Sequence, residues 1–182
     1  MVHISITRSF TRIIFIESIA MDKRIQEKVY AVLGGLGIPY EKVDHRALFS
    51  QADNEESPIN IDGVILKNLF LRNKSKGKYY LFTLPLDKKA DLLSLQHELD
   101  ESRLSFGNEE MLAEKLNTMK GSVSLLNIIG VESTDVVFLI DQDIYRYEKI
   151  ALHPNDNTAS VIFSPKDIKK VLDHYDVEYR FI

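Results

Sequence analysis

Hydrophobic and polar positions follow two different periods along this chain. From residue 22 to residue 34 the apolar side chains recur about one helical turn apart and form a single stripe, followed by three glycines. This pattern predicts a helix over 22–34 that ends at the glycines. Residues 63–71 and 78–84 are strand-like apolar runs, and the polar segment between them ends in Gly77. That arrangement predicts a β-hairpin.

The rest of the chain alternates between helical and extended patterns. A helix is expected over 90–99, and another after Asn108, a good N-cap followed by two glutamates in the positive first turn. The run 164–167, Ser-Pro-Lys-Asp, predicts a third helix start, with a serine cap and proline in the first helical position. Further strands are expected over 40–43, 135–140, 160–163 and 177–182, and loops or turns over 49–60, 120–124 and 141–145.

These elements sum to five or six strands and about four helices in 182 residues. Several strands join as hairpins and there is no regular series of βαβ units, which disfavours a doubly wound nucleotide-binding fold. The predicted class is therefore mixed α/β (α+β). We expect one domain over residues 21–182, with a central mixed, largely antiparallel sheet flanked by helices.

The first twenty residues lie outside this pattern. They carry two arginines, and their apolar run covers only residues 13–16 before Glu17, which is too short for a secretory signal. We expect residues 1–20 to be a disordered or non-native extension, with Met21 as the true start. A mitochondrial-type presequence is the alternative, because the segment is nearly free of acidic residues.

Two polar interruptions stand out against the apolar pattern. Lys67 and Asn68 lie inside the first strand of the hairpin, where a polar group costs free energy unless it is paired. His153 opens a loop that also holds asparagines and a threonine, up to residue 159. A functional site is expected at such positions, although Lys67 could equally extend its amine to solvent from a strand and His153 could be a turn residue.

Composition narrows the chemistry. The chain has no cysteine, which excludes disulfides, a cysteine nucleophile and thiolate metal sites, and fits a cytoplasmic location. The nucleophile-elbow, phosphate-loop, dinucleotide and zinc-protease motifs are all missing, so neither a metal nor a cofactor is expected.

Charge bears on possible partners. The net charge is −4, so no global basic surface attracts nucleic acid. A local cluster of basic residues runs from Lys67 to Lys78. Its charge pattern alone favours a solvated strand and hairpin turn over a basic binding patch, which stays an alternative. No apolar run is long enough to span a membrane, so no membrane association is expected.

Several short motifs, taken in order, resemble the YbaK-type aminoacyl-tRNA deacylase domain, which also occurs inserted in bacterial prolyl-tRNA synthetases. The motifs are Gly37-Ile38-Pro39-Tyr40, Val43-Asp44-His45, Lys67-Asn68-Leu69-Phe70-Leu71, Tyr79-Tyr80-Leu81, Arg103-Leu104-Ser105-Phe106, Gly121-Ser122-Val123-Ser124 and the loop from His153 to Ala159. The resemblance extends from about Met21 to the C-terminus. Within the family the chain looks like the freestanding editing proteins that hydrolyse Ala-tRNA(Pro).

The resemblance implies a role for each matched position. Lys67 and Asn68 match the catalytic lysine of the pocket and its neighbour, which helps to hold the substrate end. Gly121, with Ser122 and Ser124, matches a G-x-x-x-P loop that lines the aminoacyl pocket, and His153 matches the second pocket wall. The implied partner is the aminoacylated 3′ end of tRNA, and an association with prolyl-tRNA synthetase is a further expectation.

One departure from the family pattern bears on specificity. Leu125 stands where the G-x-x-x-P loop has proline, and its bulk and free backbone put the choice of amino acid in question. Two alternatives to Ala-tRNA(Pro) deacylation therefore remain. One is a deacylase for another mischarged tRNA, such as Cys-tRNA(Pro), and the other is a non-catalytic tRNA- or amino-acid-binding protein, against which the presence of Lys67 argues. The remaining histidines with a helical or strand context, at 45, 97 and 174, are interpreted as structural or surface residues.

Overall fold

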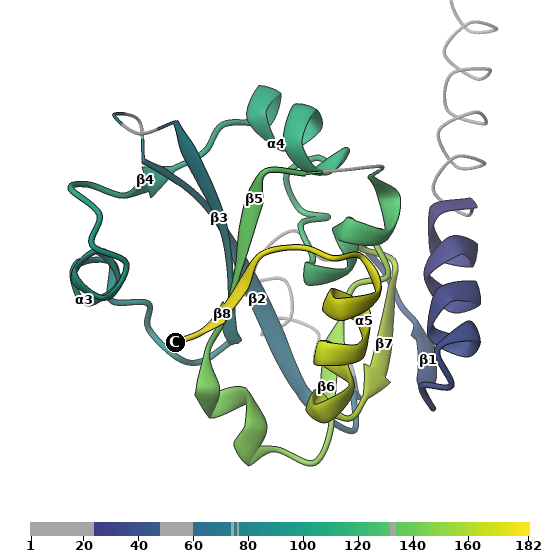
Figure 1. Ribbon diagram of the computed structural model, residues 1–182. Helices are drawn as coiled ribbons and strands as arrows, with labels where there is room; N and C mark the ends of the chain where they lie inside the picture. Colours follow the sequence, from purple (N-terminus) through teal and green to yellow (C-terminus); the bar gives the residue numbers. More distant parts are fainter. Residues whose placement is uncertain (1–23, 48–59, 74, 76, 132–133) are drawn as a thin grey trace, which may run out of the picture.

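The hairpin predicted from the sequence lies at the centre of the fold. The computed structural model describes residues 24–47, 60–73, 75, 77–131 and 134–182. Strand β2 (Val64–Asn73) pairs antiparallel with β3 (Lys78–Pro85) over its length from Leu66 onward, which confirms the hairpin. Both strands run through the middle of the molecule in Figure 1. The expectations for residues 1–20 and for most of the 49–60 loop lie outside the described residues.

A mixed sheet is built around this hairpin. The strand order is β1 (Glu41–Asp44), β7 (Ala159–Phe163), β6 (Ile150–Leu152), β2, β3, β5 (Val136–Ile140) and β8 (Tyr179–Phe181), with β4 (Ser105–Phe106) also paired to β2. Four of these pairings are antiparallel and three are parallel, which confirms the mixed sheet. The described residues form eight strands rather than five or six, because β4 and β6 have two and three residues and carry no periodic pattern.

The helices begin close to the predicted positions. Residues 24–35 are helical, and the later helices are α3 (Leu92–Glu98), α4 (Glu109–Leu116) and α5 (Ile168–His174). Asn108 caps α4 as expected, accepting from the Met111 N–H at 3.0 Å. Ser164 is the N-cap residue of a short 3-10 helix, η3 (Pro165–Asp167), that leads into α5, which confirms the predicted start with proline in the first turn. The serine side chain makes no cap hydrogen bond, so that part of the expectation is wrong. The described residues contain two further 3-10 helices. η2 (Gln142–Arg146) lies at the predicted turn over 141–145, and η1 (Leu125–Gly130) follows the predicted loop over 120–124, in a segment for which no element was predicted.

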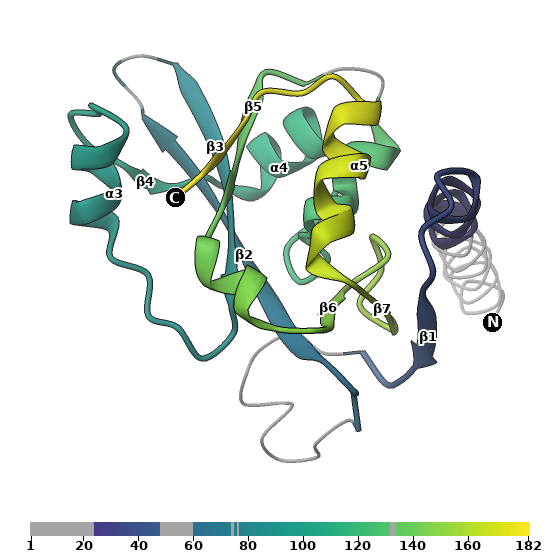
Figure 2. The same cartoon turned by 60° about the horizontal axis from the view of Figure 1, so that its bottom comes forward.

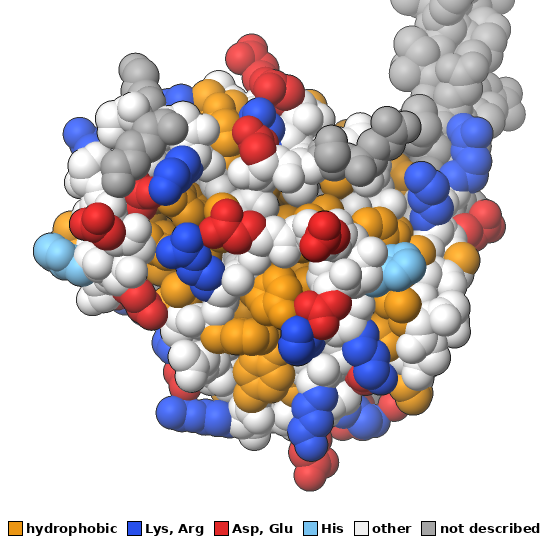
Figure 3. Space-filling view, viewed as in Figure 1, with side chains coloured by type: hydrophobic (Ala, Val, Ile, Leu, Met, Phe, Trp, Pro, Cys, Tyr) orange, Lys and Arg blue, Asp and Glu red, His pale blue; other side chains and the backbone are white. Residues whose placement is uncertain are grey.

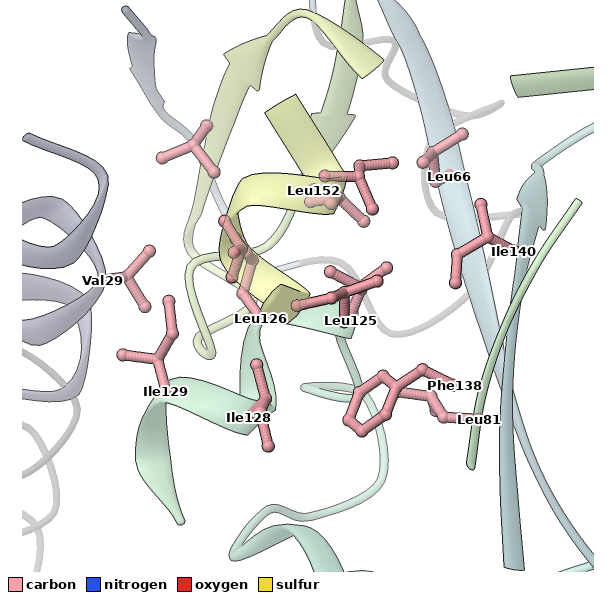
Figure 4. Packing of buried hydrophobic residues seen from close by; sticks show 14 of the residues in the cluster. Val29, Leu66, Leu81, Leu125, Leu126, Ile128, Ile129, Phe138, Ile140 and Leu152 are labelled. Atoms are coloured by element: carbon pink, nitrogen blue, oxygen red, sulfur yellow. The ribbon is translucent and has the colours of Figure 1, made fainter. Parts of the chain in front are cut away.

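Two hydrophobic clusters lie on opposite faces of the hairpin. Alternate residues of β2 reach the two clusters: Leu66 and Phe70 enter the larger one, and Leu71 enters the smaller one. The larger cluster is covered by α4, α5, η1 and the 24–35 helix, whereas α3 stands alone over the smaller one (Figures 1 and 2). Leu125 and Leu126 of η1 lie deep among the buried side chains of the larger cluster (Figure 4). This packing fixes η1 against the central strands.

One exposed face carries aromatic side chains together with lysines. Figure 3 shows hydrophobic side chains gathered over η2 and the C-terminal strand, with Lys and Arg beside them. The rings of Tyr145 and Phe181 pack edge to face there, with their centroids 5.5 Å apart, next to Lys166 and Lys169. No helix within the described residues is both long and apolar enough to cross a membrane.

Candidate active site

The open edge of β2 forms one wall of the main cavity. Strand β6 pairs only with the start of β2, at Val64 and Ile65, and β4 pairs only with its end, at Leu71 and Arg72. The stretch between them is therefore bordered by a strand on one side only. A cavity of about 680 Å³ lies beside it, within the size range of small-molecule sites. Its walls are Ile65, Leu66, Lys67, Asn68, Leu69, Phe70, Leu86, Phe106, Gly107, Asn108, Glu109, Leu112, Lys120, Gly121, Val123 and His153.

Lys67 is held at the wall of this cavity by a backbone contact. Its half-buried side chain donates from Nζ to the Leu86 carbonyl oxygen at 2.8 Å. Leu86 is itself fixed, since its N–H donates to the Ile65 carbonyl at 2.9 Å. An ammonium has three donors, so this geometry leaves donors for a ligand. The cation is thus positioned by the strand and still able to bind an oxygen atom.

Asn68 joins β2 to the Val123–Leu125 segment by direct hydrogen bonds. Its Oδ1 accepts from Thr83 Oγ1 at 2.8 Å and from the Leu125 N–H at 3.1 Å, and its Nδ2 donates to the Val123 carbonyl at 3.2 Å. Both lone pairs of Oδ1 and one of the two Nδ2 hydrogens are engaged. The first role of this amide is to hold the Val123–Leu125 segment against the strand, with one hydrogen left for a ligand.

The loop that begins at Gly121 is shaped by glycine and by serine caps. Gly121 has φ of 93°, a conformation that L side chains rarely adopt. Ser124 is completely buried, where its Oγ donates to the His153 carbonyl at 2.7 Å and accepts from Leu126 N–H as the N-cap of η1. The buried serine therefore ties the loop to the segment that carries His153.

Two backbone donors of this loop stay available. The N–H groups of Ser122, Ser124 and Leu125 are bonded to Met119 O, Asn127 Oδ1 and Asn68 Oδ1. Those of Gly121 and Val123 form no hydrogen bond with any residue that the structure describes. Both residues line the cavity, so their amides are candidates for binding an anionic oxygen.

His153 directly follows β6, the strand that pairs with the start of β2, and a backbone contact sets its tautomer. Its Nδ1 donates to the Ala159 carbonyl at 3.1 Å, which leaves Nε2 as an acceptor in the neutral ring. Burial lowers the pKa of His153, and the neighbouring His45 lowers it further. The neutral imidazole is therefore the favoured form at neutral pH.

His45 is a neighbour of the site that sequence reasoning did not assign to it. Its ring lies 6.0 Å from the His153 ring, and its Nε2 accepts from Ser160 Oγ at 3.0 Å. His97 and His174 are exposed and lie outside the cavity walls. The Val43-Asp44-His45 motif was a signal for this position, but only the β1–β7 pairing brings it beside His153.

Four of the six predicted site residues line one cavity: Lys67, Asn68, Gly121 and His153. Ser122 and Ser124 are not part of the wall, and their hydrogen bonds shape the loop behind it. Sequence reasoning assigned no role to Phe106 or Lys120, which also line the cavity. Phe106 belongs to a motif that the sequence had already singled out.

Leu125 does not occupy the position expected from its bulk. Its side chain is fully buried in the larger hydrophobic cluster and forms no part of the cavity wall. Its N–H, which a proline would lack, donates to Asn68. The leucine thus adds a hydrogen bond behind the cavity and no bulk within it.

Comparison with known proteins supplies the family. Residues 60–171 match the model of the aminoacyl-tRNA editing domain. The chain belongs to the aminoacyl-tRNA editing domain family. The resemblance inferred from the sequence is confirmed, as are the editing and deacylase predictions at the level of the family.

Individual relatives agree with this assignment. The chain is 33% identical over 152 residues to the prolyl-tRNA editing protein ProX of Acetoanaerobium sticklandii, covering 84% of this chain and 93% of that protein. It is 32% identical over 139 residues to prolyl-tRNA synthetase associated domain-containing protein 1 of Mus musculus, covering 74% of this chain and 82% of that protein. A crystal structure of a candidate trans-editing enzyme for prolyl tRNA synthetase superposes with a TM-score of 0.63 at 19% identity, covering 86% of this chain and 95% of that chain. This similarity confirms the fold.

Proposed function

We propose that this protein is a trans-editing hydrolase that removes alanine from mischarged proline tRNA. The observation that carries the proposal is the convergence of Lys67, the Gly121 loop and His153 on one cavity at the open edge of β2. The names of the two relatives, a prolyl-tRNA editing protein and a prolyl-tRNA synthetase associated domain protein, support proline tRNA as the substrate.

The reaction needs positioning more than a protein nucleophile. An aminoacyl-tRNA ester is already activated, so the site must hold the ester, admit water to the carbonyl and stabilise the oxyanion. The Lys67 ammonium binds the carbonyl oxygen or the terminal phosphate as a compact cation. The free N–H groups of Gly121 and Val123 are in place to stabilise the negative charge that develops on the carbonyl oxygen.

Each step of this hydrolysis balances without a cofactor. Water attacks the carbonyl carbon and the ester C–O bond breaks. One proton of the water goes to the leaving ribose oxygen, and the other passes to solvent as the amino acid leaves with a carboxylate. The neighbouring hydroxyl of the terminal ribose assists the water in this scheme, which accounts for a site without a dedicated protein base. The Nε2 acceptor of His153 orients the α-ammonium group of the amino acid.

Replacement of Lys67 by alanine tests the proposal. Purified protein is given proline tRNA charged with alanine, with cysteine or with proline, and deacylation is followed over time. We expect rapid loss of alanine, and a fall of kcat/KM in Lys67→Ala by about 100-fold, because the variant lacks the charge that meets the oxyanion. Lys170→Ala is the matched control. Lys170 lies on α5, forms an ion pair with Asp167 of η3 and does not line the cavity.

The other outcomes separate the alternatives. Loss of cysteine in place of alanine would shift the substrate to Cys-tRNA(Pro). Binding of charged tRNA without turnover, with Lys67→Ala changing affinity alone, would establish a non-catalytic binding protein. No loss and no binding with any of the three would contradict proline tRNA as the substrate.

A further inference from the structure

Phe106 is an exposed aromatic residue in the cavity wall for which the proposed chemistry has no use. Its side chain is 60% exposed, although it lies beside a buried core. No aromatic ring among the described residues stacks on it. An exposed phenylalanine in the wall of a cavity offers one free π-face, and such a face stacks well on a flat aromatic ligand.

The backbone around this ring is held on both sides. Phe106 pairs with Leu71 in the β4–β2 ladder, and the next N–H, of Gly107, donates to the Phe70 carbonyl at 2.9 Å. A Cβ at Gly107 would lie 2.3 Å from the Phe70 ring, so only glycine permits this close approach. Asn108 then caps α4. The ring therefore projects from a backbone with little freedom, and a fixed platform loses little entropy when it binds a ligand.

The cavity divides into two parts with different chemistry. Lys67, Asn68 and His153 bring polar groups to the β2 edge, while Phe106 and Leu112 make an apolar wall. The volume of about 680 Å³ is larger than a single small amino acid needs. The exposed Lys120 adds a positive charge at the wall. A ligand that joins a flat aromatic group to a negatively charged group fits this wall, because Phe106 offers a ring and Lys120 a positive charge.

We propose that Phe106 is the stacking platform for the adenine base of the 3′-terminal nucleotide, with Lys120 facing its phosphate. The proposal rests on the proposed function, because the terminal adenosine is the group that carries the ester. Base-on-ring stacking does not depend on the rest of the tRNA sequence. Phe106 therefore contributes affinity for any charged tRNA end and leaves the choice of amino acid to the other parts of the site.

A single-tryptophan variant gives a readout that does not require catalysis. The chain contains no tryptophan, so Phe106→Trp places one indole in the cavity wall. We expect saturable quenching of its fluorescence by the trinucleotide CCA, and little quenching by the same probe with an abasic 3′ ribose. Leu93→Trp is the control, because Leu93 is 69% exposed on α3 and does not line the cavity.

Kinetic variants test the same contact during turnover. We expect Phe106→Ala to raise KM for the charged tRNA about tenfold with kcat within about twofold, because the stack binds ground and transition states alike. Phe106→Tyr should retain the wild-type KM. Phe106→Leu should behave like alanine, because it keeps apolar bulk and loses the ring.

The results separate this proposal from the proposed function. Absence of quenching by CCA, with KM of Phe106→Ala within twofold of wild type, would overturn the stack. A KM for Phe106→Leu equal to that of wild type would also overturn it, since hydrophobic area alone would then suffice. If the wild type deacylates no charged tRNA while CCA still quenches Phe106→Trp, the editing reaction fails and the adenine platform stands.

Discussion

At the scale of single residues, the contact between Asn68 and Leu125 explains the departure from the family loop. Leu125, at the position where the resemblance implies a loop proline, is the first residue of η1, and its N–H donates to Asn68 Oδ1. Asn68 also holds the Val123 carbonyl and accepts from the buried Thr83 hydroxyl. The leucine therefore strengthens the support of the loop, and its side chain contributes to the core.

Leu125→Pro tests this interpretation. Proline is tolerated in the first position of a helix, so the backbone can accept it. The variant loses a fully buried leucine side chain and one hydrogen bond, and we expect the free energy of unfolding to fall by about 2–4 kcal/mol. Chemical denaturation measures this loss.

The choice of amino acid should hardly change in the same variant. Residue 125 does not line the cavity, so the ratio of kcat/KM for alanyl- and cysteinyl-charged tRNA should stay within about threefold of wild type. A tenfold change in that ratio would mean that residue 125 shapes the pocket. Leu125→Ala, which keeps the N–H, separates the lost hydrogen bond from the lost side chain.

At the scale of elements, β2 is a strand shared by two partial sheets. Strand β6 pairs with its start and β4 with its end, and the cavity opens in the gap between them. Gly107, which directly follows β4, lies close to the ring of Phe70 in β2. This contact holds β4 beside the gap. The shape of the cavity therefore depends on a two-residue strand.

Gly107→Ala tests the dependence on β4. An added methyl would overlap the ring of Phe70, which is 5% exposed and has little room to move. We expect a loss of about 1–3 kcal/mol of stability together with a raised KM, because β4 must shift. Gly34→Ala is the contrasting change: its Cβ meets nothing within 4 Å in the 24–35 helix, so stability should rise by about 0.4–1 kcal/mol. Equal effects of the two substitutions would contradict this account.

At the scale of the whole molecule, the net charge opposes a large electrostatic contribution to tRNA binding. The chain carries −4 overall, and the described cavity walls offer two lysines, Lys67 and Lys120, against one glutamate. An acidic protein that binds a polyanion depends on a few local cations and on contacts with the bases.

The salt dependence of KM checks this point. With about two phosphate contacts to a single-stranded end, log KM should rise with log salt at a slope of about 1 to 2. Steady-state deacylation between low and moderate salt measures the slope. A slope above about 4 would reveal a broad basic contact with the tRNA that the described surface does not suggest.

The sequence by itself determined the local elements and the identity of the key polar residues. Apolar periodicity and the turn at Gly77 predicted the hairpin, and Asn108 predicted the start of α4, because these signals depend on neighbours within a few residues. Lys67 and Asn68 were conspicuous because a polar pair interrupts a strand. Their ordered neighbours carried the family resemblance.

Only the tertiary structure decided how these residues form a site. The gap along β2 depends on pairings with β4 and β6, which are too short for any periodic pattern and are distant in sequence. The same distance hid the approach of His45 to His153, the use of Asn68 as a support for the loop and the burial of Leu125. Each of these depends on where a side chain points after the strands have paired, and local sequence does not encode that direction.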